Sequence, residues 1–151
     1  TCSVAVHHLV LTDEKLQTFD SRYKVTPPLR NEADRKALLN AVLDNTIDCI
    51  TSDHNPIDIE NKKMEFDLAK NGTIGLESAF GALLTVLPLE KGIETPSITE
   101  GNTANLSLFT TNNDWDFSKD SILSKSKNSA FIGQKMQGKA IGIYNQKKLV
   151  L

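Results

Sequence analysis

Asp53 and His54 are the side chains in this sequence most suited to chemistry. They follow an apolar run at residues 47–50, and Pro56 prevents that run from continuing as a central strand. A carboxylate at the tip of a buried strand can bind a metal ion or accept a proton. Parallel α/β barrels keep their catalytic groups at this end of their strands. The same residues could instead form a simple turn that closes the strand.

His7 and His8 are a second candidate pair. They follow a short alternating run at residues 2–6, which predicts a strand and then a loop. Adjacent residues of a strand point to opposite faces, so the two imidazoles are not expected to bind one ion. The pattern favours a polar pair at a strand end.

A helix is predicted between these two strands. Asn31 is a good N-cap, Asp34 follows at the third helical position, and Asn45 is a suitable C-terminal stop. Its apolar stripe consists of Ala33, Ala37, Leu38, Ala41 and Val42. The order strand, helix, strand predicts a parallel pair with a right-handed crossover. Thr12 is expected to begin a separate helical turn.

The second half of the chain begins with a glycine-containing loop at residues 71–75. A second amphipathic helix is then predicted, ended by Pro88 and carrying Leu76, Phe80, Leu83, Leu84 and Leu87. From residue 98 onward the pattern becomes that of strands, at 104–109, 139–144 and 148–151, with a helical turn after Ser118. These few strands form a small β unit with little apolar surface of its own.

The amino-acid composition excludes some classes of partner. The 151 residues carry a net charge of −2 and are 39% hydrophobic, which favours one ordinary soluble domain. A basic stripe and a long apolar run are both absent from the sequence, so neither nucleic acid nor a membrane is an expected partner. Cys2 and Cys49 are expected to be buried reduced thiols of a cytoplasmic protein, with a disulfide as the alternative. Because the chain starts inside a predicted strand, we expect its natural N-terminus to lie upstream.

Several motifs, in this order, resemble the dihydroorotase family of the amidohydrolase superfamily. Close relatives among allantoinases and hydantoinases share the pattern, and the PPLR element favours dihydroorotase. The motifs are VAVHHLVLTDE at 4–14, KVTPPLRNEADRKAL at 24–38, ITSDHNP at 50–56 and NGTIGLESAF at 71–80, followed by a matching tail at 98–151.

The resemblance implies an α/β fold. It implies the C-terminal portion of a (β/α)8 TIM-barrel amidohydrolase plus the C-terminal strands of a small β-sandwich subdomain. The expected boundaries are 1–92 for the last barrel strands and helices and 93–151 for the β segment. The connection at residues 87–97 is shorter than the family's, so either the chain carries a deletion or the sequence omits residues.

The resemblance also implies a zinc site with one or two ions, most of whose ligands would lie upstream of Thr1. Asp53 would be the metal ligand supplied here, and it would carry the proton between the attacking hydroxide and the leaving nitrogen. His7 and His8 match the family pattern but not its metal ligands. The implied activity is interconversion of carbamoyl-aspartate and dihydroorotate in pyrimidine biosynthesis. This segment alone should be inactive, because catalytic zinc normally has three protein ligands.

Several positions of the implied substrate pocket depart from the family. Its asparagine before the two prolines is Thr26 here, its substrate-contacting histidine is Ile57, and its apolar-aromatic pair before the loop glycine Gly72 is Lys70-Asn71. Each lost partner to a charged substrate costs about 1–3 kcal/mol. Two hypotheses therefore stand: an active enzyme, or an inactive homologue that acts as a scaffold for aspartate transcarbamoylase. Other expected partners are the rest of its own barrel, a cyclic amide substrate and further copies of itself.

Overall fold

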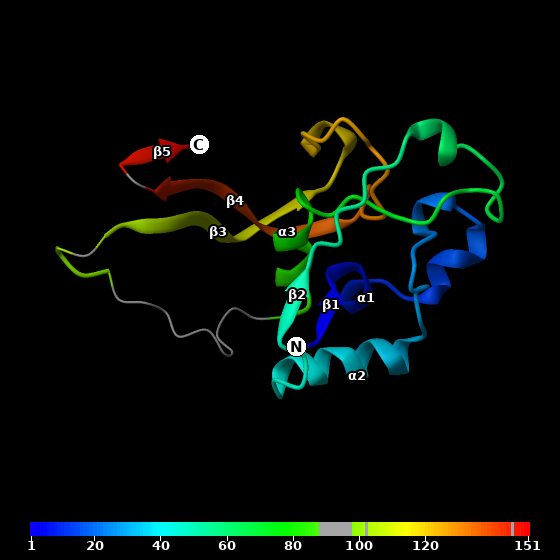
Figure 1. Ribbon diagram of the computed structural model, residues 1–151, viewed down its shortest axis with the longest axis horizontal. Coiled ribbons are helices and arrows are strands. Elements are labelled where there is room, and N and C mark those ends of the chain that lie inside the picture. Colours follow the sequence, from blue (N-terminus) through cyan, green and yellow to red (C-terminus); the bar gives the residue numbers. More distant parts are fainter. Residues whose placement is uncertain (88–97, 102, 146) are drawn as a thin grey trace.

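The computed structural model describes residues 1–87, 98–101, 103–145 and 147–151. Its first unit is a parallel pair of strands, β1 (Ser3–Ala5) and β2 (Cys49–Thr51), connected through helix α2 (Glu32–Leu43). Val4 lies opposite Ile50, and Ala5 lies opposite Thr51. Helix α2 lies below the two strands in Figure 1, and its apolar side chains pack in one cluster with Val4 and Ile50. The predicted strand–helix–strand order is confirmed.

Helix α2 begins where its capping residues require. The Asn31 side chain accepts a hydrogen bond from the Asp34 N–H, and Asn45 ends the helix in the left-handed conformation at φ 64°. The predicted stripe is only partly correct, since Ala33 and Ala37 are exposed. The helix contacts the core through Leu38, Leu39, Ala41 and Val42.

The segment after β1 differs from the prediction. Residues Val6–Val10 form a short helix, α1, rather than a loop, and His7 lies within it. Val6 and Leu9 are three residues apart, so a helical turn places both on one side of α1, where each is buried in a different apolar cluster. The predicted turn after Thr12 is present as η1 (Asp13–Thr18), and a second 3₁₀ turn, η2 (Ser21–Tyr23), follows it.

Helix α3 (Ala79–Leu84) is shorter than the sequence predicts. Leu76 precedes it and is 64% exposed, so it does not belong to the apolar face. A Cβ atom at Gly81 would lie 3.1 Å from the Met136 Cβ, so this glycine lets α3 pack closely on the C-terminal sheet. The predicted stop at Pro88 and the expected domain boundary at residue 92 lie outside the described residues.

The C-terminal unit is an antiparallel sheet of β3 (Asn105–Asp116), β4 (Lys135–Asn145) and β5 (Lys148–Val150). Turn η4 (Lys119–Ser121) follows β3, and turn η3 (Ile59–Asn61) follows β2. One end of the β3–β4 ribbon packs on α3, and the other end extends away from the body of the molecule (Figure 1). The predicted C-terminal strands are confirmed, although β3 and β4 are longer than expected.

The main apolar core joins the two halves of the chain. Val6, Ile74 and Ala82 pack in one cluster with Phe117 and Phe131. The loops that follow β2 are therefore packed directly against the C-terminal segment.

Both cysteines are exposed and free, so their predicted burial and the alternative disulfide are both wrong. Cys2 precedes β1 and Cys49 begins β2, at the end of a sheet that has only two strands among the described residues. None of the described residues buries either cysteine. Among the described residues, no helix is long and apolar enough to cross a membrane.

Candidate metal and catalytic site

The side chain of Asp53 lies next to that of His7. The side chain of His54, its neighbour in sequence, makes other contacts. Asp53 and His7 follow the C-terminal ends of β2 and β1, which are hydrogen-bonded neighbours. His7 Nε2 is 3.9 Å from Asp53 Oδ2. The His7 side chain is 1% exposed and that of Asp53 is 48% exposed, so a buried imidazole lies beside a half-exposed carboxylate.

His7 is neutral at pH 7. Burial, together with the nearby His8, lowers the pKa of His7 to about 3. The contact with Asp53 is therefore not an ion pair. A neutral imidazole is the form that binds metal ions.

Neither nitrogen of His7 has a hydrogen-bond partner among the described residues. Leaving a buried polar group without a partner costs about 1–3 kcal/mol, so such a group calls for a functional explanation. His8 differs, since its Nε2 lies 2.9 Å from the Pro27 carbonyl oxygen. The interpretation of the histidines as an ordinary polar pair thus fits His8 but not His7.

The donor set of His7 and Asp53 fits a zinc ion. Zinc binds imidazole nitrogen and carboxylate oxygen at about 2.0–2.2 Å, which places two ligands of one tetrahedral ion roughly 3.4 Å apart. The observed separation of 3.9 Å is close to that value. Within the described ranges, no group of three or more His, Cys, Asp or Glu side chains could hold a metal ion, so His7 and Asp53 would need further ligands to bind zinc.

The backbone at Asp53 is in the left-handed region, with φ 45°. Non-glycine residues adopt this conformation rarely, aspartate more often than most, and the neighbouring contacts help to hold it. The Asp53 N–H donates to Thr51 Oγ1 at 3.1 Å. His54 Nδ1 accepts from the backbone N–H groups of Gly75 and Leu76, at 3.3 Å each. His54 is therefore an anchor for the turn.

Thr26 lines the same cavity as Asp53. This cavity has a volume of about 390 Å³ and lies between β1, the end of β2 and the loop that carries Pro27 and Pro28. The structure thus brings together two of the residues expected at the site, although the sequence separates them widely.

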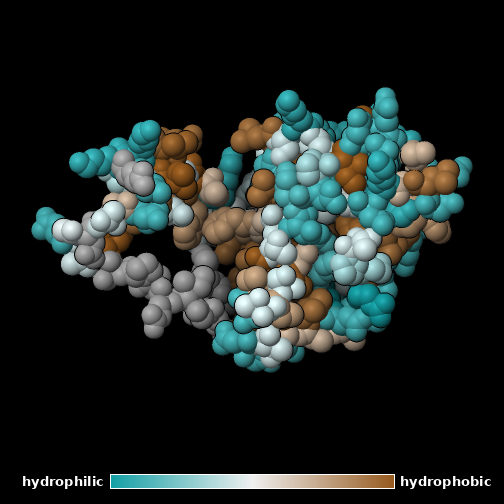
Figure 2. Space-filling model, viewed as in Figure 1, coloured by the Kyte–Doolittle hydropathy of each residue, from teal (hydrophilic) through white to brown (hydrophobic). Residues whose placement is uncertain are grey.

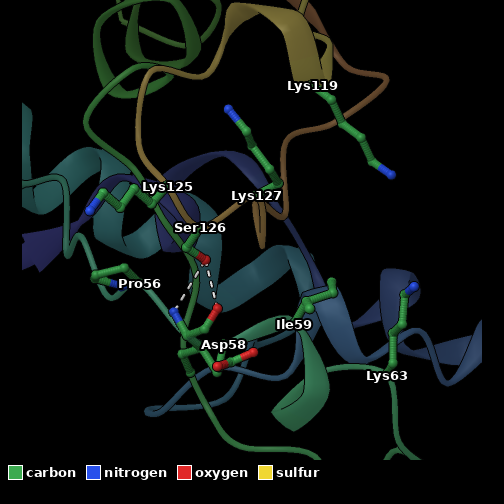
Figure 3. A pocket seen from close by; sticks show the side chains of 9 residues that line it. Pro56, Asp58, Ile59, Lys63, Lys119, Lys125, Ser126 and Lys127 are labelled. Atoms are coloured by element: carbon green, nitrogen blue, oxygen red, sulfur yellow. Dashed lines mark hydrogen bonds between the residues drawn. The ribbon is translucent and has the colours of Figure 1, made fainter.

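Ile57 and Gly72, two other residues expected at the site, do not line this cavity but lie against each other. A Cβ atom at Gly72 would lie 2.9 Å from Ile57 Cδ1 and 2.6 Å from Asn55 Nδ2, so the glycine makes room for the loop after Asp53. Ile57 lines a separate cavity of about 640 Å³, together with Lys63, Lys119, Lys125 and Lys127 (Figure 3). Asn71 is exposed and lines neither of these two cavities.

The sequence is similar to curated dihydroorotases. That of Elusimicrobium minutum is 37% identical over 157 residues, which cover 91% of this chain and 36% of the relative. That of Chlorobaculum tepidum is 33% identical over 172 residues, covering 100% of this chain and 39% of the relative. No family model matches the sequence. The chain is similar to one part of the dihydroorotases. It spans little more than a third of the length of these relatives and corresponds to their C-terminal part.

Solved structures show the same fold. An L-hydantoinase from Arthrobacter aurescens matches with a TM-score of 0.83 at 22% identity, over 99% of this chain and 38% of that one. A dihydroorotase from Saccharomyces cerevisiae, in complex with 5-fluoroorotic acid, matches with a TM-score of 0.70 at 15% identity, over 95% and 43%. The expected fold is confirmed as the C-terminal portion of a TIM-barrel amidohydrolase. The sequence analysis did not pair His7 with Asp53, because the two residues are brought together only by the β1–β2 register.

Proposed function

We propose that this chain is the C-terminal part of a zinc-dependent cyclic amide hydrolase that interconverts dihydroorotate and carbamoyl-aspartate in pyrimidine biosynthesis. The observation that carries the proposal is the buried, unpartnered His7 imidazole beside the Asp53 carboxylate at the ends of two parallel strands. The similarity to curated dihydroorotases supports the choice of substrate.

Asp53 Oδ2 is the atom of this chain that the resemblance assigns to the metal. His7 Nε2 lies 3.9 Å from it and would be a further ligand, one that the resemblance does not include. The remaining ligands would come from other parts of the complete protein, because zinc at a catalytic site normally has three protein ligands. When bound, zinc would lower the pKa of a water molecule and polarise the amide carbonyl. The burial of His7 keeps it unprotonated, so it is available as a ligand at neutral pH.

Asp53 would also act as the proton carrier. Its half-exposed carboxylate accepts the proton of the attacking water and returns it to the ring nitrogen as the carbon–nitrogen bond breaks. In the reverse direction the same carboxylate takes the proton from the attacking nitrogen. Thr26 lines the cavity beside Asp53 and stands where the family has its substrate-binding asparagine, so its shorter side chain would be the one facing the substrate there.

A non-catalytic scaffold is the second candidate, and Ile57 favours it. Ile57 is 9% exposed and fills the space beside Gly72, so it offers no polar group to a charged substrate. A protein of this kind would keep the barrel fold and bind a partner such as aspartate transcarbamoylase.

Assays of the complete protein with added zinc test the proposal. We expect hydrolysis of dihydroorotate, and we expect Asp53→Ala to reduce kcat by about 10²–10⁴-fold, the usual contribution of a general acid–base group. His7→Ala should reduce zinc content and activity together. Asp114→Ala removes an exposed carboxylate from β3 and serves as the control.

Equal turnover by the native protein and Asp53→Ala would refute the role of Asp53. Absence of turnover in the zinc-loaded native protein, together with capture of purified aspartate transcarbamoylase, would favour the scaffold.

A further inference from the structure

Asn128 uses every hydrogen-bonding function of its side chain. It is 3% exposed. Its Nδ2 donates to the carbonyl oxygens of Asn55 and Gly72, at 3.3 Å each. Its Oδ1 accepts from the Ile57 N–H at 3.2 Å and from the Ser126 hydroxyl. An amide has two donor hydrogens and two acceptor lone pairs, so no capacity remains.

The backbone of Asn128 extends the same network. Its carbonyl oxygen accepts from the Ile74 N–H and from the Thr73 hydroxyl, at 3.2 Å each. Ser126 joins this network through shared hydrogens: its hydroxyl proton lies between Asn128 Oδ1 and the Ile57 carbonyl oxygen, and its Oγ shares the Ile57 N–H with Asn128. Figure 3 shows the two contacts of Ser126 beside Pro56. One residue of the C-terminal segment therefore connects the loop after Asp53 with the glycine loop.

The contacts act immediately downstream of the strained turn. Asn55 and Ile57 follow Asp53 by two and four residues, and both are held through their backbone atoms. The left-handed conformation of Asp53 persists only if the chain on each side is fixed. Upstream, β2 is fixed by its pairing with β1. Downstream, the fixed points are Asn128, the His54 anchor and the hydrogen bond from the Asn55 N–H to the Thr73 carbonyl oxygen.

We propose that Asn128 is a positioning residue that sets the direction of the Asp53 carboxylate, so that the C-terminal β segment controls the geometry of the metal and proton-transfer site. The role assigned to Asp53 rests on the proposed function. The fixing of the Asp53 turn by Asn128 does not, and it can be measured separately.

The experiment compares Asn128→Ala with Ser129→Ala in the complete protein. Ser129 is adjacent, equally buried, and its hydroxyl contacts Ile74 and Phe131 but no residue of the Asp53 loop. Both variants lose buried hydrogen bonds, so both should melt at lower temperature than the native protein. Measurements are made well below both melting temperatures.

Three quantities are measured: cobalt affinity by chelator competition with the visible spectrum of the bound ion, kcat and KM for dihydroorotate, and amide hydrogen exchange of residues 51–57. For Asn128→Ala we expect cobalt affinity and kcat to fall about 10–100-fold, the usual effect of losing a residue that orients a ligand. The cobalt spectrum should change, KM should change by less than about threefold, and exchange at residues 53–57 should accelerate. Ser129→Ala should leave all of these near their native values.

A merely structural role predicts a different result. If the two variants are destabilised and Asn128→Ala keeps the native cobalt spectrum, kcat and exchange rates, the proposal is overturned. If the native protein neither binds cobalt nor turns over, the proposed function fails, and exchange alone decides the positioning role. Faster exchange at residues 53–57 in Asn128→Ala only would support it, and equal exchange in both variants would overturn it.

Discussion

At the scale of single residues, one group of the candidate site, Asp53, can be predicted from the sequence, and the other, His7, cannot. Asp53 can be predicted because it is a carboxylate shortly after an apolar run, at the end of a predicted strand, and because the surrounding motif resembles that of a known family. His7 cannot, because its importance lies in a contact across 46 positions of sequence that depends on the β1–β2 register. Asn128 is concealed for the same reason, since its partners are Asn55, Ile57 and Gly72.

Gly75 provides a test of how tightly the Asp53 turn is held. A Cβ atom at this position would overlap the carbonyl oxygen of Ser52, a backbone atom that cannot move without shifting Asp53. We expect Gly75→Ala to lower the free energy of unfolding by at least the usual overpacking cost of about 1–3 kcal/mol, and to reduce metal affinity. Chemical denaturation and chelator competition measure the two effects.

Gly133→Ala is the matched control for this substitution. Gly133 has φ 83° and no atom within 4 Å of the added Cβ, so its substitution carries only the conformational cost and should not affect the metal. If Gly75→Ala retained native stability and native metal affinity, the close packing of the glycine loop on Ser52 would have no consequence for the site.

At the scale of elements, the sequence predicts a helix correctly where the helix has its own capping residue, stop residue and sufficient length. Helix α2 has a capping residue, a stop and enough length, so its position is correct from sequence. Helix α1 has five residues, two of them valine, and lacks a side-chain cap. It forms because Val6 and Leu9 are buried in two different clusters, which is a tertiary effect. Helix α3 also depends on tertiary packing, since it contacts β4 and Gly81 lies against Met136.

Lys62 joins two loops that surround the proline segment. Its ammonium group donates to the carbonyl oxygens of Ser21 and Lys24, at 2.8 and 3.2 Å, and the Ser21 hydroxyl donates back to the Lys62 carbonyl oxygen. Burial, with the charge of Lys24 adding to it, lowers the pKa of Lys62 to about 8 from 10.5. The folded state therefore releases this proton at lower pH than the unfolded state does.

The lowered pKa of Lys62 predicts a pH dependence of stability. Between pH 8 and 10.5 the unfolded chain binds more protons at Lys62 than the folded chain, so the contribution of this group to stability increases as the pH rises. We expect the melting temperature of the native protein, relative to Lys62→Met, to increase from pH 7.5 to pH 10. The neighbouring exposed Lys63→Met is the control and should show no such trend relative to the native protein. A difference between native and Lys62→Met that is constant or decreases over this range would contradict the prediction.

At the scale of the whole molecule, the described chain leaves much apolar surface uncovered. The sheet of β1 and β2 has two strands among the described residues, so each strand has an edge without a hydrogen-bonded neighbour there. Apolar side chains also gather on the projecting C-terminal strands (Figure 2). The exposed ones include Phe109, Ile141, Ile143, Leu149 and Val150. The curated relatives are more than twice as long as this chain, and we expect the rest of the barrel to cover these surfaces.

The uncovered surface predicts that residues 1–151 self-associate when they are expressed alone. Unpaired strand edges and a large exposed apolar patch both favour association, because each can be satisfied by another copy. Sedimentation should show species heavier than the 16.6 kDa monomer, in amounts that increase with concentration. Ile143→Lys combined with Leu149→Lys places charges on β4 and β5 and should reduce the association, whereas Lys125→Ala, in an exposed loop, should not. A monodisperse 16.6 kDa species with a sharp cooperative melt would show instead that these residues form a complete domain whose exposed apolar surface needs no partner.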